Sequence, residues 1–397
     1  MRILYLHPAG TFGGASKSLI ELYRQLTGQG VEGIVLTPAG SSAEAFEAAG
    51  MTVRQVRGLS QFDNTRYGRY RGLRWLILLR ELWLLPASLW GLWRLRHERV
   101  DLIHVNEITL LPLGWLAKRI WRVPLVMHVR SLQCGPGSSR RTRRIHAWLR
   151  QHADAVVAID HTVAATLGPD LPLHVVHNGL ALPPGGAAPG RSPGGVVRVG
   201  FLGVLVPLKG VFELVEAVRL LRDRGVAVEC LVAGENARHL SGPKAWLLAR
   251  LGFARDVRAE LEAFIKREHL QDRISLLGFV ADVQSVYEQL DILCFPSHLN
   301  AAGRPVFEAA FHGVPSVVAI NKPLPDAVVD GITGLAVPAP DPVLIADALE
   351  RLVRDPALRR RLGVQARRWA DETFSIEANA ARMATIYRSL LAAPEYR

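Results

Sequence analysis

The chain has 397 residues, of which 49% are hydrophobic and 21% are charged, a composition typical of globular rather than disordered proteins. This length exceeds what one ordinary hydrophobic core holds and suits two domains. The net charge of +12 is uneven, because residues 1–180 hold 22 Lys and Arg against 12 Asp and Glu. A basic half predicts an anionic partner such as a membrane surface, a phosphorylated acceptor or nucleic acid, unless its arginines only cover a solvated face.

Strands alternate with helical patterns along the first half of the chain. After the first apolar run a glycine pair precedes a helix expected at 16–27. Parallel strands that are buried on both faces form continuous apolar runs, and the strands expected here have that form. They lie at 2–7, 31–38, 51–56, 100–107, 124–130, 155–160 and 173–178.

A segment rich in proline and glycine, 179–195, then marks a domain boundary. Beyond it we expect strands at 196–203, 226–234, 273–279, 291–297, 315–320 and 334–338. A long polar helical stretch leads to residue 268, and further helices are expected at 211–223, 303–312, 342–353 and 375–392.

This order predicts an α/β protein with two doubly wound, Rossmann-like domains, 1–178 and 196–374. The C-terminal helix, 375–397, is expected to cross back to the first domain. Ligands bind at the carboxyl ends of the strands in such sheets, so we expect the cleft between the domains to hold the site.

The cysteines and acidic residues carry no metal or disulfide pattern. Cys134, Cys230 and Cys294 are scattered, which favours a reducing cytoplasm. There is no Asp-x-Asp sequence and no cluster of Asp, Glu and His with ligand spacing. We therefore expect no metal and no cofactor. The N-terminal apolar run is too short for a signal peptide.

Several short motifs follow one another in the second half. They are the turn Gly203-Val204-Leu205-Val206-Pro207-Leu208-Lys209-Gly210, the segment Leu277-Gly278-Phe279-Val280, Pro296-Ser297, Gly303, Glu308-Ala309, Gly313-Val314-Pro315 and the turn 330–335. In this order and spacing they resemble the retaining glycosyltransferases of family 4. The resemblance covers nearly the whole chain and is strongest at 197–338. It implies the GT-B fold, a nucleotide-sugar donor linked to UDP or GDP, and donor contacts at Gly203, Phe279 and Val280.

Lys209 is the leading catalytic candidate, because it lies at a strand-to-helix turn. Free N–H groups and the helix dipole stabilise phosphate at such a place, and a lysine adds a full positive charge aimed at the leaving diphosphate. Lysine is rare in this chain, with six residues against 42 arginines. The alternative is a solvated turn lysine.

The loop 297–308 resembles the Glu-x7-Glu motif of the family. Its second acid is Glu308, expected on the first turn of a helix. The resemblance implies that Glu308 accepts hydrogen bonds from the nucleotide ribose, and the alternative is an ordinary acid near a helix start. Asn300 stands in place of the first acid. Four residues are expected to open the helix with backbone amides near the sugar and diphosphate: Ala301, Ala302, Gly303 and Arg304.

Val204 is the second departure from the family pattern, which has an arginine there to pair with the diphosphate. Either Arg304 supplies the missing charge, or the protein is a weakened or non-catalytic relative.

The first half carries its candidates at strand ends. Gly13 and Gly14 resemble the family's glycine loop, which approaches the donor diphosphate and the acceptor. His128 stands where the family often has a histidine near the reacting sugar, with His104 as a competitor. Either histidine could instead be only a hydrogen-bonded residue at a strand end. Asn178, in the turn before the crossover, is interpreted as part of a hinge first and as a ligand contact second.

Residues 54–99 combine ten arginines with four tryptophans. Arginine and tryptophan on an amphipathic helix are typical of a membrane interface. The most apolar stretch, 73–93, contains three charged residues and Pro86, which argues against a transmembrane helix. A core-packed helix hairpin with a solvated arginine face is the alternative. Five arginines are assigned to the acceptor or membrane side: Arg130, Arg140, Arg141, Arg143 and Arg144.

The leading hypothesis is a metal-independent retaining glycosyltransferase that uses a glycan or lipid-linked acceptor. It would be cytoplasmic or peripheral at the inner face of the cell membrane. A GT-B-fold epimerase or phosphorylase and a non-catalytic partner-binding subunit are the alternatives. Nucleic-acid binding is a lesser option, since no recognition motif accompanies the charge.

Overall fold

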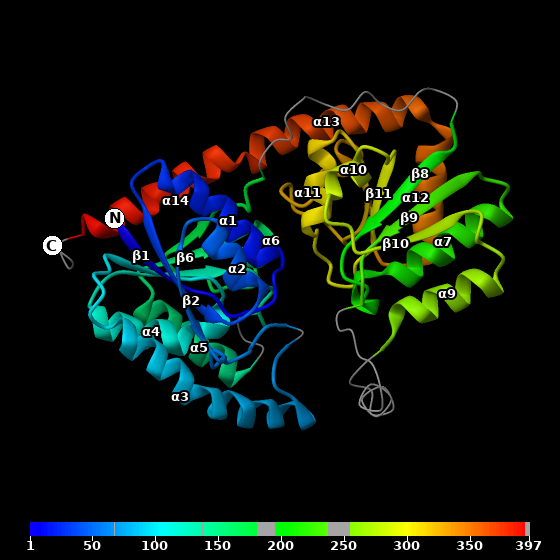
Figure 1. The fold of residues 1–397 in the computed structure, drawn as a ribbon. Helices are drawn as coiled ribbons and strands as arrows, with labels where there is room; N and C mark the ends of the chain where they lie inside the picture. Colours follow the sequence, from blue (N-terminus) through cyan, green and yellow to red (C-terminus); the bar gives the residue numbers. More distant parts are fainter. Residues whose placement is uncertain (67, 136–138, 181–194, 237–254, 394–397) are drawn as a thin grey trace. The chain divides into compact units, whose positions relative to one another are not determined.

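The computed structural model of the chain describes residues 1–66, 68–135, 139–180, 195–236 and 255–393 (Figure 1). The chain forms two compact units, of which unit 1 comprises 1–181 and 374–397 and unit 2 comprises 182–373. Most of the expected linker and most of the polar stretch before residue 268 lie outside the described residues.

Unit 1 contains a seven-stranded parallel sheet with the strand order β3-β2-β1-β4-β5-β6-β7. The strands are β1 (Arg2–Leu6), β2 (Glu32–Pro38), β3 (Thr52–Val56), β4 (Leu102–Val105), β5 (Leu125–Val129), β6 (Ala155–Ala158) and β7 (Leu173–Val175). The helical elements are α1 (Gly14–Thr27), α2 (Ser41–Ala48), η1 (Gly72–Leu76), α3 (Ile77–Leu95), η2 (Ile108–Leu110), α4 (Leu111–Trp121), α5 (Arg140–His152), α6 (His161–Ala164) and α14 (Ile376–Leu391).

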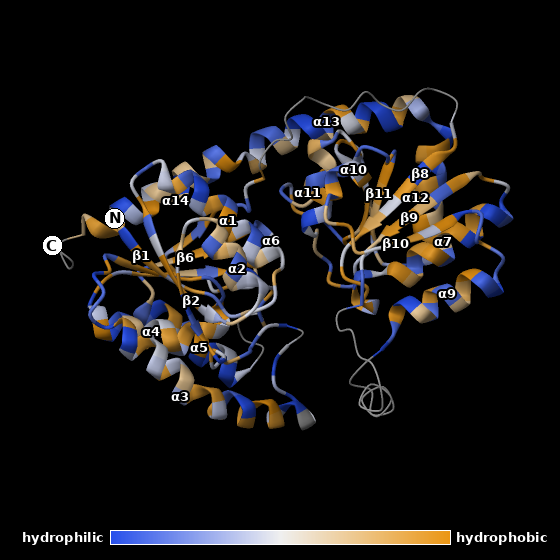
Figure 2. Ribbon diagram, viewed as in Figure 1, coloured by the Kyte–Doolittle hydropathy of each residue, from blue (hydrophilic) through white to orange (hydrophobic). Residues whose placement is uncertain are grey.

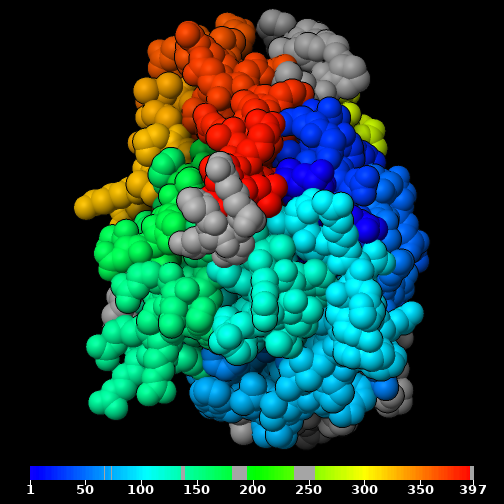
Figure 3. Space-filling model, turned by 90° about the vertical axis from the view of Figure 1, so that its left-hand side faces the viewer, coloured from blue at the N-terminus to red at the C-terminus, as the bar shows by residue number. Residues whose placement is uncertain are grey.

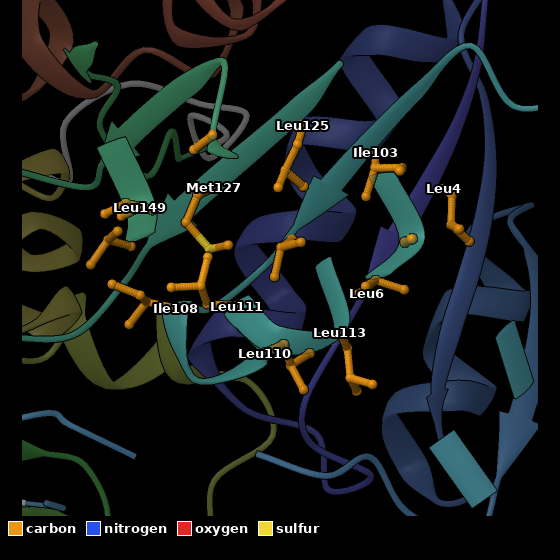
Figure 4. Close-up of a cluster of buried hydrophobic side chains, with 14 of the residues drawn as sticks. Leu4, Leu6, Ile103, Ile108, Leu110, Leu111, Leu113, Leu125, Met127 and Leu149 are labelled. Carbon is orange, nitrogen blue, oxygen red and sulfur yellow. The ribbon is translucent and has the colours of Figure 1, made fainter. Parts of the chain in front are cut away.

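The central strands of unit 1 are buried on both faces. Every residue of β4, β5 and β6 is buried, as the apolar runs predicted. One face packs against α3, α4 and α5 in a cluster of leucine, isoleucine, valine and methionine side chains, part of which Figure 4 shows. The other face packs against α1 and α14.

The C-terminal helix returns to unit 1, as expected. Ala380, Met383 and Tyr387 of α14 belong to the same buried cluster as Ile3 and Tyr5 of β1. The C-terminal segment, red in Figure 3, lies against the dark blue N-terminal segment. The sequence alone does not show which face of the sheet this helix covers.

Unit 2 contains a six-stranded parallel sheet with the order β10-β9-β8-β11-β12-β13. The strands are β8 (Val197–Leu202), β9 (Val228–Ala233), β10 (Ile274–Gly278), β11 (Ile292–Phe295), β12 (Ser316–Ala319) and β13 (Gly334–Val337). The helical elements are η3 (Pro207–Lys209), α7 (Val211–Asp223), α9 (Val257–Arg267), α10 (Val283–Tyr287), α11 (Arg304–Phe311), α12 (Pro342–Arg354) and α13 (Pro356–Phe374).

All thirteen expected strands are present, and the α/β fold class is confirmed. Two helix starts differ from expectation. Helix α1 begins at Gly14, so Gly14 belongs to the helix and not to a loop before it. Helix α11 begins at Arg304 after Gly303, so Ala301 and Ala302 precede the helix and Glu308 lies in its second turn, not its first.

Candidate active site

The predicted donor residues lie at the carboxyl edge of the sheet of unit 2. Strands β8 and β11 are neighbours, and the chain runs outward from them in opposite directions. Such a reversal is where doubly wound sheets bind ligands. The loops after the two strands are joined, because the backbone N–H of His298 and the hydroxyl of Ser297 both donate to the carbonyl of Leu208. A side chain at Gly210 would collide with the carbonyl of Pro296.

Lys209 ends the short helix η3, next to Gly210, which adopts a left-handed conformation (φ 78°). Its side chain folds back toward the backbone of Gly203, where an added Cβ would lie 3.0 Å from Nζ. Burial lowers the pKa of the Lys209 amine, and no neighbouring carboxylate raises it. In the described part of unit 2, Lys209 therefore presents a partly buried cation without an anionic partner.

Glu308 is held by two donors on separate helices. The Arg304 Nε donates to Oε1 at 2.8 Å, and the Tyr287 hydroxyl donates to Oε2 at 2.9 Å. The Arg304 and Glu308 side chains are only 17% and 16% exposed. Burial and the Glu308 charge raise the pKa of the Tyr287 phenol well above its usual value. The Tyr287 phenol therefore keeps its proton as a donor, and the two hydrogen bonds fix the direction of the Glu308 carboxylate.

Asn300 has a structural partner, since its Oδ1 accepts from the backbone N–H of Asn321 at 2.7 Å. Its φ of 51° lies in the left-handed region, which asparagine adopts more readily than most residues. Gly303 packs against the ring of Phe295, where a Cβ would clash. Close packing, rather than ligand approach, thus explains the glycine within the structure itself.

Phe279 follows β10 at the same edge of the sheet, next to the partly buried Val280. Its ring is 78% exposed, more than any other large hydrophobic side chain described. An exposed aromatic ring at a ligand-binding edge offers a face for stacking a planar group. Val204, by contrast, offers the same edge no polar group and is 45% exposed.

The sheet of unit 1 has a matching reversal between β1 and β4. Four polar side chains form a continuous chain of hydrogen bonds along its carboxyl edge. The Asn106 amide donates to Nδ1 of the buried His7 at 2.8 Å, and the Arg130 Nε donates to the Asn106 oxygen at 2.8 Å. Arg130 also donates to the Asn178 Oδ1 at 2.7 Å. Arg130 is therefore part of the site's framework, which its assignment to the acceptor or membrane side did not anticipate.

His104 and His128 act together and need not be treated as competitors. The Tyr387 hydroxyl lies 2.6 Å from the His104 Nδ1, and the His104 Nε2 lies 3.2 Å from the His128 Nδ1. The Arg130 guanidinium, which can only donate, lies 3.4 Å from that same His128 Nδ1. The His128 proton must then sit on Nε2.

Burial keeps both histidines neutral. It lowers the pKa of His104 to about 3 and that of His128 well below its usual value, with the Arg130 charge as a further cause. The His128 Nε2 is buried without a partner in the described residues, beside a small pocket. His128, Arg130, His177, Asn178, Asn379 and Met383 are among the residues that line this pocket. A neutral N–H donor without a protein partner can bind a hydroxyl oxygen that reaches it.

Glu107 follows Asn106 and is partly buried. Its carboxylate accepts from the backbone N–H of Ile108 at 2.8 Å. Burial raises the pKa of Glu107 to about 7. Its hydrogen bonds, which include those with the Ile108 backbone and the Ser131 side chain, and the charge of Arg130 oppose this shift. A carboxyl group that titrates near neutrality at a strand end is a candidate proton acceptor.

Some glycine and arginine candidates of unit 1 have free space or solvent beside them, and one arginine is held by hydrogen bonds within the unit. Gly13 precedes α1 in an extended conformation, and a Cβ at Gly13 or Gly14 would meet nothing. Space for a ligand is therefore present there. Arg141 is engaged, because it donates to the Asn64 Oδ1 and the Tyr70 carbonyl. Three arginines at the start of α5 are exposed: Arg140, Arg143 and Arg144.

Sequence reasoning missed five residues of these networks, namely His7, Asn106, Glu107, Tyr287 and Tyr387. His7 ends the expected strand 2–7, and Asn106 and Glu107 end the expected strand 100–107, so position at a strand end was a usable signal for them. No comparable signal existed for Tyr387, because its contact with His104 joins residues 283 positions apart.

Two family models match the chain. The one described as "Glycosyl transferases group 1" matches residues 189–369, and the one described as "Glycosyl transferase 4-like domain" matches residues 13–179. Their boundaries fall close to those of unit 2 and of the main segment of unit 1.

Curated relatives match over nearly the full length. The D-inositol 3-phosphate glycosyltransferase of Streptomyces bingchenggensis is 30% identical, over 96% of this chain and 86% of the relative. The enzyme of the same name from Corynebacterium glutamicum is 28% identical, over 96% of this chain and 93% of its own.

Solved structures show the same fold. HepE from Anabaena, solved with UDP-glucose, has a TM-score of 0.74 at 22% identity, over 98% of this chain and all of HepE. Sucrose-phosphate synthase from Thermosynechococcus elongatus has a TM-score of 0.72 at 18% identity, over 98% and 99% of the two chains. With its two parallel sheets, its paired switch-point sites and these relatives, the chain belongs to the group 1 glycosyltransferases of GT-B fold.

Proposed function

We propose that this glycosyltransferase transfers a sugar, with retention and without a metal ion, from a UDP- or GDP-sugar to a glycan or lipid-linked acceptor. Unit 2 binds the nucleotide sugar and unit 1 binds the acceptor. The free, buried cysteines are compatible with a cytoplasmic enzyme. A lipid-linked acceptor would bring it to the inner face of the cell membrane.

The observation that carries the proposal is the uncompensated cation of Lys209 at the switch point of unit 2. When the bond between the anomeric carbon and the diphosphate oxygen breaks, the electron pair stays on the diphosphate and the sugar becomes oxocarbenium-like. A partly buried ammonium group stabilises that growing negative charge more strongly than a solvated one, because less water screens it. Lysine thus performs the charge stabilisation that a metal ion gives other transferases.

The other residues have binding roles in this proposal. The fixed Glu308 carboxylate accepts hydrogen bonds from the two ribose hydroxyls. The Phe279 ring stacks on the nucleobase, which an exposed aromatic at this edge supports. In unit 1, the His128 Nε2 donates to a sugar hydroxyl, and His128 stays neutral while it does so.

The relatives suggest which ligands to test first. Because HepE is solved with UDP-glucose, that sugar nucleotide is the first donor to try. D-inositol 3-phosphate is the first acceptor, since the curated relatives are named for it. Its phosphate also suits the basic first half of the chain.

The decisive experiment measures binding and hydrolysis of a panel of UDP- and GDP-sugars by the purified chain. We expect saturable binding of one donor and slow release of its nucleotide, at a rate that EDTA does not change. Product NMR should show the anomeric configuration of the donor. Inhibition by EDTA that Mg²⁺ or Mn²⁺ restores contradicts metal independence, and an inverted product contradicts retention.

A non-catalytic subunit is the second candidate, and one observation favours it. Val204 leaves the diphosphate side without the family's arginine, and Arg304 is already paired with Glu308. The same panel separates the two functions. A scaffold that has lost its donor site would bind none of the nucleotides.

A further inference from the structure

Helix α3 turns a row of large apolar side chains to the solvent. Its exposed residues recur at helical spacing on one face, and Leu79, Trp83 and Trp90 are 64%, 59% and 56% exposed. The same face includes Leu82, Leu89 and Trp93. Figure 2 shows hydrophobic residues along the length of this helix. Soluble proteins rarely leave so large an apolar row uncovered without a binding partner.

The opposite face of α3 is the one that holds the helix to unit 1, and it includes polar residues. Glu81 is buried and accepts from the backbone N–H of Gln61 at 2.8 Å. Ser88 accepts from the backbone N–H of Ser60 and donates to the Leu84 carbonyl. Gly91 packs closely against Val56 and Leu36. The helix is therefore fixed in rotation, with its apolar row facing outward.

This anchoring argues for a helix that lies along a bilayer and not one that crosses it. Among the described residues, the stretch Arg74–Leu95 is long and apolar enough to span a membrane by length and composition. A crossing helix would have to give up the buried contacts of Glu81 and Ser88 and place a carboxylate in hydrocarbon. An in-plane helix keeps those contacts and buries only the outward row.

Arginines surround the apolar row. The Arg57 guanidinium lies over the Trp83 ring at 4.3 Å, and that of Arg96 lies over the Trp93 ring at 3.8 Å. Arg141 lies 5.3 Å from the Trp75 ring, which connects the start of α5 to this surface. The exposed Arg140, Arg143 and Arg144 extend it. This charge distribution fits an anionic surface and disfavours a second copy of the chain, whose arginines would face these.

We propose that the outward row of α3 is a docking surface for an anionic lipid bilayer. The leucine and tryptophan side chains insert at the level of the headgroups and upper acyl chains, and the arginines contact lipid phosphates. Binding requires both the apolar row and the arginines. The apolar side chains insert into the bilayer interface, and the arginines make the helix prefer anionic lipids. The surface does not depend on turnover, so it can be tested separately from the proposed reaction.

The test is flotation of the full chain with vesicles of phosphatidylcholine, with and without phosphatidylglycerol. We expect binding that needs phosphatidylglycerol and weakens at high salt. The triple variant Leu79→Gln, Leu82→Gln, Leu89→Gln should lower the partition coefficient roughly a hundredfold. The variant Arg140→Gln, Arg143→Gln, Arg144→Gln should lower it about fivefold for each arginine removed.

Two controls change an exposed apolar residue and three exposed arginines away from α3. Val364→Gln replaces an exposed apolar residue of α13, and Arg360→Gln, Arg361→Gln, Arg382→Gln removes three exposed arginines. Both should float like the parent chain. Donor hydrolysis and thermal unfolding of every variant confirm that the fold and the donor site are intact.

Three results would overturn the proposal. They are failure of the parent chain to float with either vesicle, normal flotation of the leucine variant, and equal loss in the control variants. Light scattering covers the remaining case. If the parent chain is a dimer that the leucine variant dissociates, and neither binds vesicles, the row is a surface for self-association.

Discussion

The ammonium group of Lys209 is partly buried in a turn that three glycines keep compact. Gly203 and Gly210 have positive φ values, and a side chain at Gly234 would collide with the Gly203 carbonyl. These glycines let the two backbone turns approach, so that the lysine is positioned by the fold and not by an ion pair. Burial without a counter-ion leaves its charge available to a ligand.

Replacing Lys209 with methionine keeps the volume of the side chain and removes its charge. We expect kcat to fall about 10²–10³-fold with a small change in KM, because the charge acts mainly as the diphosphate leaves. Steady-state kinetics with the donor that the sugar-nucleotide panel selects measures this split. Lys266→Met, at an exposed position on α9, is the control. A variant that loses donor affinity while keeping kcat would show that Lys209 only binds.

Tyr387 is joined to His128 through His104, and we infer that it positions His128. Tyr387→Phe removes the hydroxyl that donates to the His104 Nδ1. The ring proton of His104 can then move from Nε2 to Nδ1, and that of His128 is no longer held on Nε2 by the His104 donor at its Nδ1. We expect kcat to fall about three- to tenfold, as for the loss of one hydrogen bond. Tyr23→Phe, another buried tyrosine of the same cluster, is the matched control.

The readout specific to this relay is the tautomer of His128, which nitrogen chemical shifts report. A purely structural effect of Tyr387→Phe would lower the melting temperature and leave the His128 proton on Nε2. In that case, the relay would have no role in catalysis.

At the scale of elements, the sequence predicted the strands well and the loops poorly. Strands such as β4 and β5 are apolar at nearly every position because both faces are covered, and that pattern is local. The start of α11 depended on the φ of Asn300 and on the packing of Gly303 against Phe295, which no local pattern records. The sequence therefore predicted where these loops lie along the chain, but not their conformation.

Helix α11 carries both charges of the Arg304–Glu308 pair on successive turns. A guanidinium has five N–H donors, so Arg304 can hold Glu308 and contact a phosphate together. Arg304→Ala should then weaken binding of UDP about tenfold or more and change the affinity for uridine much less.

Titration calorimetry with UDP and uridine measures the two affinities, with Tyr287→Phe as a comparison. Tyr287 also holds Glu308 but brings no positive charge. Equal weakening of both ligands in Arg304→Ala, matched by Tyr287→Phe, would show that Arg304 acts only through Glu308. The missing charge at Val204 would then be uncompensated.

At the scale of the whole molecule, contacts distant in sequence determine the polar framework of unit 1. His7 and Asn106 lie 99 residues apart and meet because β1 pairs with β4. The sequence predicted that both strands exist but not that they are neighbours in this register. Helix α14 adds Tyr387 to unit 1 from the far end of the chain. Position at a strand end and the family resemblance therefore singled out Lys209 and His128 as candidates, and topology was needed for the residues that contact His128.

The buried histidines of unit 1 predict a loss of stability in acid. His7 and His104 have pKa values lowered to about 3 by burial, and that of His128 is lowered too. In the unfolded chain, the pKa of each histidine returns to about 6.5. Below pH 6.5 the unfolded chain therefore binds more protons than the folded chain, and each histidine costs about 1.4 kcal/mol of unfolding free energy per pH unit.

Glu107 opposes this trend, which makes it the sharpest probe. Its pKa is raised from 4.5 to about 7 in the folded chain, so its contribution to stability is full below pH 4.5 and is lost as the pH rises through 7. Glu107→Gln removes that loss. The variant should be more stable than the parent chain above pH 7, by up to about 3 kcal/mol, and the gap should close toward pH 4.5.

Apparent melting temperatures of the two chains across this range measure the difference in stability. The control Glu47→Gln, which replaces an exposed acid on α2, should show no such pH-dependent difference. A constant difference at every pH would mean that folding leaves the pKa of Glu107 unchanged and that the carboxyl edge of β4 is more polar than its burial implies.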